Sequence, residues 1–195
     1  MVSARISCTA LTACLAIFFQ PNLFASENPQ PHVARQSLPT LDINVGGEIS
    51  VNGDQAAKTP WSSKCFDSTG KVQLVQYVAA NRKAVRQNQP FNDALKEKHF
   101  SAEELSTTVI VNMADSMAIT RAIVANKLEK SKIKHQTISF VMDDQGVGLE
   151  RWGMAKKSSA VFVLDGKGKI LFAKDGPLSK LEIEDTIKLI ESQII

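Results

Sequence analysis

The chain has 195 residues, of which 44% are hydrophobic and 22% charged, and its formal net charge is +3. This composition is typical of one globular domain, and a domain of this length needs neither disulfides nor a metal to fold. The weak positive charge does not support nucleic-acid binding, so we exclude nucleic acid from the expected partners.

The first 25 residues have the pattern of a secretory signal peptide. Arg5 supplies a positive charge, residues 6–19 carry none, and Ala25 places a small residue before a polar stretch. The apolar run is shorter than the ~20 residues that a membrane-spanning helix needs. We therefore predict export, cleavage near Ala25, and a mature chain without a transmembrane span.

Export would leave the chain with a single thiol. Residues 11–14 (LTAC) also spell a lipoprotein cleavage box, so a lipidated Cys14 is an alternative, although the apolar run continues past it. Cleavage near Ala25 removes Cys8 and Cys14 and leaves Cys65. A lone thiol cannot form an internal disulfide, so Cys65 is either inert or available to another molecule.

The first half of the mature chain predicts a hairpin, one strand and one helix. Gly46-Gly47 separates two short apolar stretches, which predicts a β-hairpin. Pro90 is expected to interrupt the helix because proline has no backbone N–H to donate. In chain order the predicted segments are a flexible lead-in at 26–37, the hairpin at 38–51, a loop or short helical turn at 61–66, a buried strand at 72–80 and a helix at 83–98.

The second half predicts two more buried strands, a helix between them, a hairpin and a final helix. Asp115 or Ser116 is expected to cap the first of these helices, and Ser179 with Glu182 forms a capping box ahead of the last. The predicted segments are strands at 107–113 and 136–142, a turn at 143–146, and a hairpin of 160–164 and 170–173 across 165–168. The apolar faces of the two helices consist of Met117, Thr120, Val124 and Leu128, and of Ile183, Ile187, Ile190 and Ile194.

This order of elements predicts the fold class. Alternating strands and helices favour parallel strands with crossover helices, and the hairpin adds antiparallel strands. The order is that of the thioredoxin-like fold. We therefore expect an α/β three-layer sandwich over residues 38–195, with a mixed central sheet flanked by helices.

Residues 70–80 (GKVQLVQYVAA) resemble the first core strand of the thioredoxins. In that family a Cys-x-x-Cys motif follows, with a helix-kinking proline five residues after the second cysteine. At the corresponding positions this chain has Arg82, Val85 and Pro90, so the resemblance implies a kept helix kink and no redox pair. The family's cis-proline corresponds to Ser159, where we expect a trans peptide bond.

Four stretches also resemble the YtfJ family of bacterial periplasmic proteins. They are residues 58–63 (KTPWSS), 108–112 (TVIVN), 146–152 (GVGLERW) and 158–176 (SSAVFVLDGKGKILFAKDG). The resemblance covers nearly the whole mature chain and implies a periplasmic location. It implies no assigned reaction and no catalytic residues.

The replaced thioredoxin motif is also the candidate binding site. Arg82, Lys83 and Arg86 surround the predicted start of a helix, where cations and exposed N–H groups favour an anion. Together with Ser158 and Ser159 they form a candidate site for an acidic group of a partner. The alternative is a solvated cationic face without a ligand.

Other chemistry-bearing residues carry weaker patterns. Cys65 is the candidate reactive thiol of an alternative function, although it precedes the first core strand instead of following it. The aspartates of the turns and the scattered histidines lack ligand spacing, so we predict no metal and no cofactor. The aromatic residues that either line a peptide groove or belong to the core are Trp61, Tyr77 and Trp152.

The sequence thus favours an exported, periplasmic thioredoxin-like protein that has no redox pair and does not act as an enzyme. Its expected role is to bind or scaffold an unidentified periplasmic protein or a small acidic ligand. The alternative is a single-cysteine thiol oxidoreductase or peroxidase that acts through Cys65.

Overall fold

The computed structural model of the chain describes residues 36–53, 55–67, 69–114 and 116–194. The expected signal peptide, Cys14 and all but the last two residues of the expected lead-in lie outside these described residues. Those last two residues already contact the domain, because Ser37 pairs with Lys169 and the Ile170 N–H donates to the Gln36 carbonyl at 2.9 Å.

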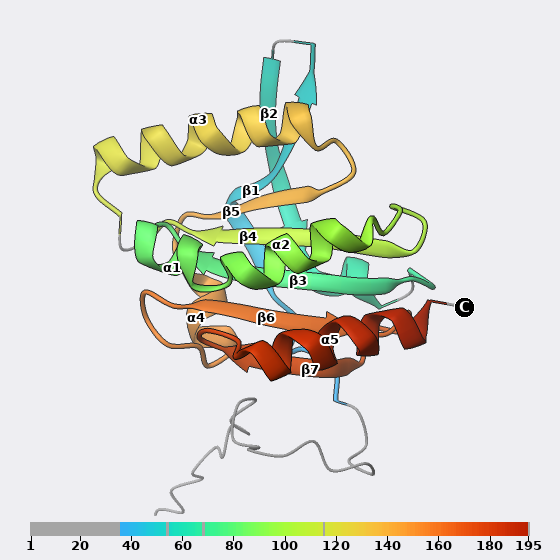
Figure 1. Cartoon of the computed structure of the whole chain (residues 1–195). Coiled ribbons are helices and arrows are strands. Elements are labelled where there is room, and N and C mark those ends of the chain that lie inside the picture. The colour runs from blue at the N-terminus through green and yellow to red at the C-terminus, as the bar shows by residue number, and fades with distance from the viewer. Residues whose placement is uncertain (1–35, 54, 68, 115, 195) are drawn as a thin grey trace, which may run out of the picture.

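A seven-stranded mixed sheet forms the centre of the fold, in the order β2-β1-β5-β4-β3-β6-β7 (Figure 1). Strand β4 pairs in parallel with β3 and with β5, and the other neighbours pair antiparallel. The strands are β1 Asp42–Asn52, β2 Gln55–Ser62, β3 Val72–Ala79, β4 Leu105–Asn112, β5 Ser139–Asp143, β6 Ser159–Leu164 and β7 Ile170–Asp175. Every residue of β3 is buried, as its mainly apolar sequence predicts, and the buried residues include Gln73 and Gln76.

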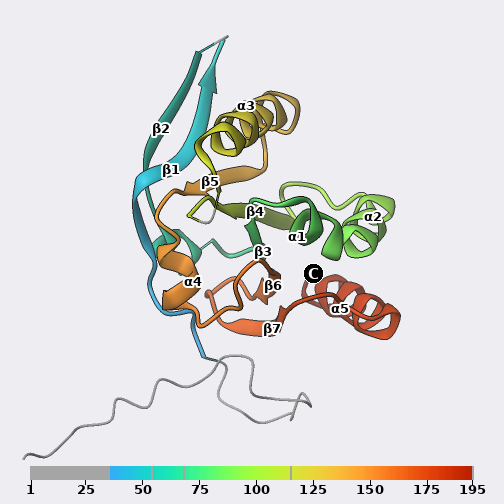
Figure 2. The same ribbon diagram turned by 90° about the vertical axis from the view of Figure 1, so that its left-hand side faces the viewer.

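Helices cover both faces of this sheet, which confirms the three-layer arrangement. Figure 2 shows the short helix α4 on one face and the other α-helices on the opposite face. The helices are α1 Arg82–Gln87, α2 Gln89–Lys98, α3 Ala118–Lys134, α4 Val147–Arg151 and α5 Lys180–Gln193, with a 3-10 turn, η1, at Ser63–Phe66. Within the described ranges, no helix is long and apolar enough to cross a membrane.

Side chains of β3 alternate between two separate cores because successive residues of a strand point to opposite faces. Val75 and Tyr77 pack with Trp152 and Phe162 on the α4 face. Val72 and Leu74 pack with Phe91 of α2 and Ile190 of α5 on the other face. The sheet is therefore anchored on both sides, and the C-terminal end of β3 has a fixed place.

Several local predictions are confirmed. The three buried strands are β3, β4 and β5, and the helix after β3 breaks at Asn88, just before Pro90. The Glu182 N–H donates to Ser179 Oγ at 3.3 Å, and the Ser179 N–H donates to Glu182 Oε2 at 2.8 Å, which closes the capping box.

The prediction that Gly46-Gly47 forms the turn of the first hairpin is wrong. Both glycines lie inside β1, at a bulge where the strand passes closely between β2 and β5. A Cβ atom on Gly46 would lie 2.2 Å from the Met142 carbonyl oxygen, and one on Gly47 would lie 2.0 Å from that of Thr59. The glycines are needed for this close approach, and the hairpin turns after Asn52 instead.

Two predictions about the middle of the chain are also corrected. Met117, and not Ser116, precedes the first turn of α3, and no side chain caps this helix; Asp115 lies outside the described residues. The Met117 side chain is 78% exposed and so does not belong to the apolar face. The turn at 143–146 is followed by the short helix α4, which the sequence analysis missed.

Candidate functional site

The start of α1 lies at the C-terminal end of β3, where a thioredoxin carries its cysteines. Asn81 caps the helix, because the Ala84 N–H donates to Asn81 Oδ1 at 2.9 Å. Arg82 is the first residue of α1, and Val85 is 56% exposed on the same short helix. The two positions that correspond to the redox pair therefore lie at the surface end of a well-formed strand and helix.

A buried asparagine fixes this end of the molecule. Asn88 Nδ2 donates to the Ser159 carbonyl at 3.2 Å and to the Gly176 carbonyl at 3.1 Å, and Asn88 Oδ1 accepts from the Leu178 N–H at 3.0 Å. The break between α1 and α2 is thereby tied to β6 and to the link between β7 and α5. The sequence analysis missed this role because the partners of Asn88 are at least 71 residues away in the sequence.

The two candidate serines differ in what they offer a ligand. Ser159 is buried, its Oγ accepts from Asn88 Nδ2 at 3.3 Å, and its N–H donates to Gln87 Oε1 at 3.0 Å. Its peptide bond is trans, as predicted, since the described residues contain no cis bond. Ser158 is half-buried and remains open to a ligand. Ser159 thus positions the site, whereas Ser158 belongs to its surface.

The candidate residues meet around two hollows on either side of α1. One, of about 580 Å³, is lined by Lys83 and Ser158 and also by Lys156 and Lys157, which the sequence analysis missed. These two lysines directly precede Ser158 in the sequence, which is the signal that would have found them. Lys157 adopts a left-handed conformation with φ of 60°.

The second hollow, of about 650 Å³, lies between α1 and α3 over the sheet. Arg82, Arg86 and Ser159 line it, together with Lys127 of α3 and mostly apolar side chains. Nothing in the sequence indicates that Lys127 lies here, because only the crossover of the chain brings α3 beside α1. All five predicted site residues therefore lie at one end of the molecule.

The charges at this end are unbalanced. In the described part of the chain, the ion pairs include none of Arg82, Lys83, Arg86, Lys156 and Lys157. The described residues that line the two hollows include no Asp or Glu. Since α1 has only six residues, its dipole adds little, and the side-chain charges determine what the site attracts. The arrangement suits an anion.

Cys65 lies apart from this site. It belongs to η1, which precedes β3, whereas Arg82 follows β3, and a strand of this length spans about 25 Å. The residue is exposed as a whole, yet the protein atoms around its thiol raise the pKa to about 11, and the Glu48 carboxylate contributes to the rise. A thiol with this pKa is almost entirely protonated at neutral pH and is a poor nucleophile.

The remaining residues singled out from the sequence are structural. Trp61, Tyr77 and Trp152 are buried, which confirms that they belong to the core. The Asp143 carboxylate is buried and accepts from the Tyr77 hydroxyl and the Gly148 N–H, each at 2.8 Å. Among the residues that the structure describes, no group of three or more His, Cys, Asp or Glu could hold a metal ion.

Comparison with known proteins identifies the family. The family model described as "Bacterial protein of unknown function (YtfJ_HI0045)" matches residues 33–193. A Haemophilus influenzae protein described as uncharacterized is 35% identical over 155 residues, which are 80% of this chain and 83% of the relative. The Escherichia coli protein YtfJ, also described as uncharacterized, is 31% identical over 156 residues, which are 80% of this chain and 84% of that protein. The chain belongs to the YtfJ family.

A solved structure supports the fold of this YtfJ-family chain. A thiol-disulfide isomerase of Corynebacterium glutamicum has a TM-score of 0.54 at 12% identity, and the match covers 80% of this chain and 96% of that one. At so low an identity the likeness concerns the fold alone. Together with the strand order, it confirms the thioredoxin-like architecture expected from the sequence.

The stretches that carried the YtfJ resemblance meet mainly in the core of the α4 face. Trp61, Ile110, Trp152 and Phe162 come one from each stretch and belong to the same apolar cluster. A Cβ atom on Gly148 would lie 2.4 Å from the Tyr77 ring, so this position requires glycine. These motifs therefore record how the core packs, and they do not by themselves assign a function to the α1 end.

Proposed function

We propose that this YtfJ-family protein is exported to the periplasm and binds an acidic group of a partner or small ligand at the α1 end, without thiol chemistry. The observation that carries the proposal is the group of cations at the α1 end. Arg82, Lys83, Arg86, Lys156 and Lys157 lie where a thioredoxin has its redox pair, and none takes part in an ion pair within the described residues.

Charge repulsion makes such a cluster unfavourable unless something balances it. Like charges near one another destabilise a fold, whereas an anion that contacts two or three of them gains charge-assisted hydrogen bonds. Arg82, Lys83 and Arg86 together line a hollow on the surface of α1, so one anion can contact more than one of them. The export part of the proposal is supported by the sequence pattern of residues 1–25.

The alternative function, thiol chemistry at Cys65, has less support. The pKa of Cys65 is raised to about 11 by its surroundings, and Cys65 lines neither hollow at the α1 end. A redox-active cysteine requires the opposite, a lowered pKa next to cations.

Titration with a simple anion tests the proposal. Inorganic phosphate is added to the isotope-labelled mature chain while the backbone amide resonances are followed by NMR. We expect saturable shifts at residues 81–87 and 155–159. The double variant Arg82→Gln, Lys83→Gln is expected to bind at least threefold more weakly. The matched control is Lys130→Gln, Lys134→Gln, which removes two exposed cations of α3 outside the two hollows.

Two results would overturn the proposal. One is a set of shifts spread evenly over all surface lysines, which indicates a non-specific ionic atmosphere. The other is equal phosphate affinity in the α1 double variant and the α3 control. Either leaves the cluster as a solvated cationic face.

A further inference from the structure

A trough runs along β4 between the helices of one sheet face. Helix α2 packs against α5, whereas α3 packs against β1 and β5. The part of the sheet formed by β4 therefore lies between α2 and α3 (Figures 1 and 2). Two adjoining hollows of about 650 and 580 Å³ follow this strip and share the side chains of Gln76, Asn92 and Val109. We call these two hollows together the β4 trough.

The floor and walls of the β4 trough are mainly apolar. Its floor includes alternate residues of β4, Thr107, Val109 and Val111, which point to the same face. The apolar side chains of its walls include Leu95, Phe100, Val124, Leu128 and Phe140. Two apolar residues that line the trough are largely exposed. Ile123 on α3 is 52% exposed, and Val85 on α1 is 56% exposed. Exposed apolar side chains gathered at one hollow mark a binding surface.

The ionic residues of the trough are all basic. Arg82, Arg86 and Lys127 line one hollow, and the other is lined by His99 and by Lys96, whose Nζ lies 3.5 Å from Asp93 Oδ1. The described side chains that line the two hollows include no Asp or Glu, although the chain has 20 acidic residues. An apolar floor with cations and no carboxylates is complementary to a molecule that combines an apolar body with an anionic group.

We infer that the β4 trough binds a straight-chain aliphatic carboxylate. Its carboxylate contacts Arg82, Arg86 and Lys127, and its alkyl chain lies along β4 towards Phe100 and Phe140. This inference rests on the proposed function for the anion at the α1 end and adds the apolar part of the ligand. Each hollow has the size and the mainly apolar lining of small-molecule sites, which are ~300–1,000 Å³.

The proposal predicts a dependence on chain length. Burial of one methylene group strengthens binding about fourfold, so two more carbons strengthen it about sixteenfold until the trough is full. A simple anion such as phosphate contacts only the cations and stays a weak ligand. An uncharged alcohol of the same length lacks the charge-assisted hydrogen bonds to the arginines and binds more weakly than the carboxylate.

Calorimetric titration of the mature chain with octanoate, decanoate and dodecanoate, below their micelle concentrations, tests the inference. We expect affinity to rise with each step and decanol to bind at least fivefold more weakly than decanoate. Ile123→Glu places a carboxylate in the trough and is expected to weaken decanoate binding at least tenfold. The matched control is Ile119→Glu on the same helix, where the 78% exposed side chain does not line the trough.

The outcomes separate this inference from the proposed function. If phosphate shifts the α1 end but affinity is flat from octanoate to dodecanoate, the inference is wrong and the proposed function stands. If decanol binds as well as decanoate, the assignment of the cations to a carboxylate is wrong. Equal loss in Ile123→Glu and Ile119→Glu also contradicts the inference. The inference is also contradicted if the wild-type chain is a dimer and Ile123→Glu dissociates it, because a second copy of the chain then covers the trough.

Discussion

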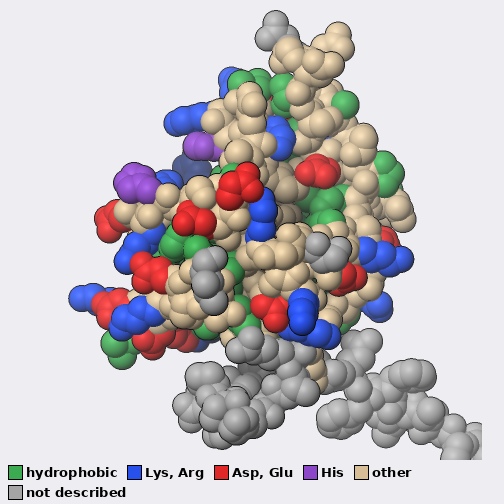
Figure 3. Space-filling view, turned by 90° about the vertical axis from the view of Figure 1, so that its right-hand side faces the viewer, with side chains coloured by type: hydrophobic (Ala, Val, Ile, Leu, Met, Phe, Trp, Pro, Cys, Tyr) green, Lys and Arg blue, Asp and Glu red, His purple; other side chains and the backbone are tan. Residues whose placement is uncertain are grey.

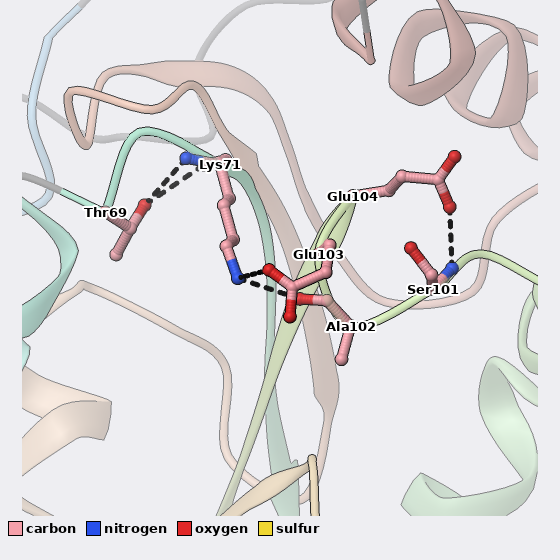
Figure 4. Close-up of polar contacts among 6 residues, drawn as sticks. All are labelled: Thr69, Lys71, Ser101, Ala102, Glu103 and Glu104. Atoms are coloured by element: carbon pink, nitrogen blue, oxygen red, sulfur yellow. Dashed lines mark hydrogen bonds and ion pairs between the residues drawn. The ribbon is translucent and has the colours of Figure 1, made fainter.

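The charged side chains near the start of β3 include an ion pair, whereas the described ion pairs include none of the cations at its other end. At its start, Lys71 Nζ lies 2.9 Å from Glu103 Oε2 and also donates to the Ala102 carbonyl (Figure 4). Next to this pair, the Ser101 N–H donates to Glu104 at 2.7 Å and lowers the pKa of that carboxyl. Figure 3 faces this end and shows basic and acidic side chains mixed over its surface.

At the other end of β3 the basic residues take part in no ion pair within the described residues. Arg82, Lys83 and Arg86 on α1 and Lys156 and Lys157 before β6 line hollows without a described Asp or Glu. The loop with the two lysines is nevertheless well anchored, because the Ala155 N–H donates to Asp175 Oδ2 at 2.6 Å and the Ala79 N–H donates to the Ser158 carbonyl at 3.0 Å.

This difference supports the proposed binding of an outside partner at the α1 end. The paired charges at the start of β3 satisfy one another and leave little for a ligand. The cations at the α1 end are held on a rigid frame but have no described acidic partner, which stability alone does not explain. A rigid frame that presents unbalanced charge is the arrangement expected of a binding site.

The largest expected effect concerns the frame of the α1 end. Asn88→Ala leaves the Leu178 N–H and the Gly176 carbonyl without their partner, and buried unsatisfied groups are costly. We expect the free energy of unfolding in urea to fall by about 3 kcal/mol. Asn92→Ala is the control, because the half-buried Asn92 side chain accepts one hydrogen bond, from the Gln76 amide, and its loss should cost only about 1 kcal/mol. Equal losses would break the claim that Asn88 anchors this end.

The next effect concerns the reactivity of the Cys65 thiol. A pKa of about 11 against an ordinary 9.0 lowers the thiolate fraction at pH 7 about a hundredfold, and higher intrinsic nucleophilicity restores somewhat under a factor of ten. Iodoacetamide should therefore alkylate Cys65 roughly tenfold more slowly than a small free thiol at pH 7. The rate should still rise above pH 9. A rate that levels off below pH 8 would contradict the raised pKa.

A smaller effect involves the capping box of α5. The Lys174 ammonium, with the Ser179 N–H, lowers the pKa of Glu182 from 4.5 to about 2. A lowered carboxyl pKa stabilises the fold above pH ~4.5, and this contribution is lost as the pH falls towards 2. Because the pair is partly exposed to solvent, we expect a loss of about 1 kcal/mol across that window. In Glu182→Gln, urea unfolding should depend less on pH between 5 and 2, whereas an unchanged slope would contradict this assignment.

The smallest effect is expected at the start of β3. Glu103 is fully exposed, so water screens its pair with Lys71 even though Lys71 lowers its pKa. Glu103→Gln should leave the urea midpoint unchanged within error and should leave phosphate binding at the α1 end unchanged. A clear loss of stability would show that the charges at this end contribute more than the comparison assumes.

The sequence predicted the features that depend on residues near one another in the chain, and it missed those that depend on distant residues. Mainly apolar stretches identified β3, β4 and β5, and the Ser179–Glu182 capping box is confirmed because its two partners lie three residues apart. Gly46 and Gly47 were misplaced because the atoms that exclude a side chain there come from Met142 and Thr59, on two other strands.

The candidate site follows the same rule. Arg82, Lys83 and Arg86 were found because they are neighbours on one helix, and Ser158 and Ser159 because they are adjacent in the sequence. Lys127 was missed because it joins Arg82 and Arg86 only through the crossover that places α3 beside α1. Asn88 was missed because its partners are at least 71 residues away in the sequence.

The central claim is that the chain keeps the thioredoxin-like frame at the α1 end but does no thiol chemistry, and catalysed reduction of insulin by dithiothreitol tests it most directly. We expect the mature wild type and Cys65→Ser to match the uncatalysed rate. Arg82→Cys, Val85→Cys is expected to exceed that rate because it places two thiols at the start of α1, and a thioredoxin serves as the active reference. Catalysis by the wild type that Cys65→Ser abolishes would contradict the account and make Cys65 the functional residue.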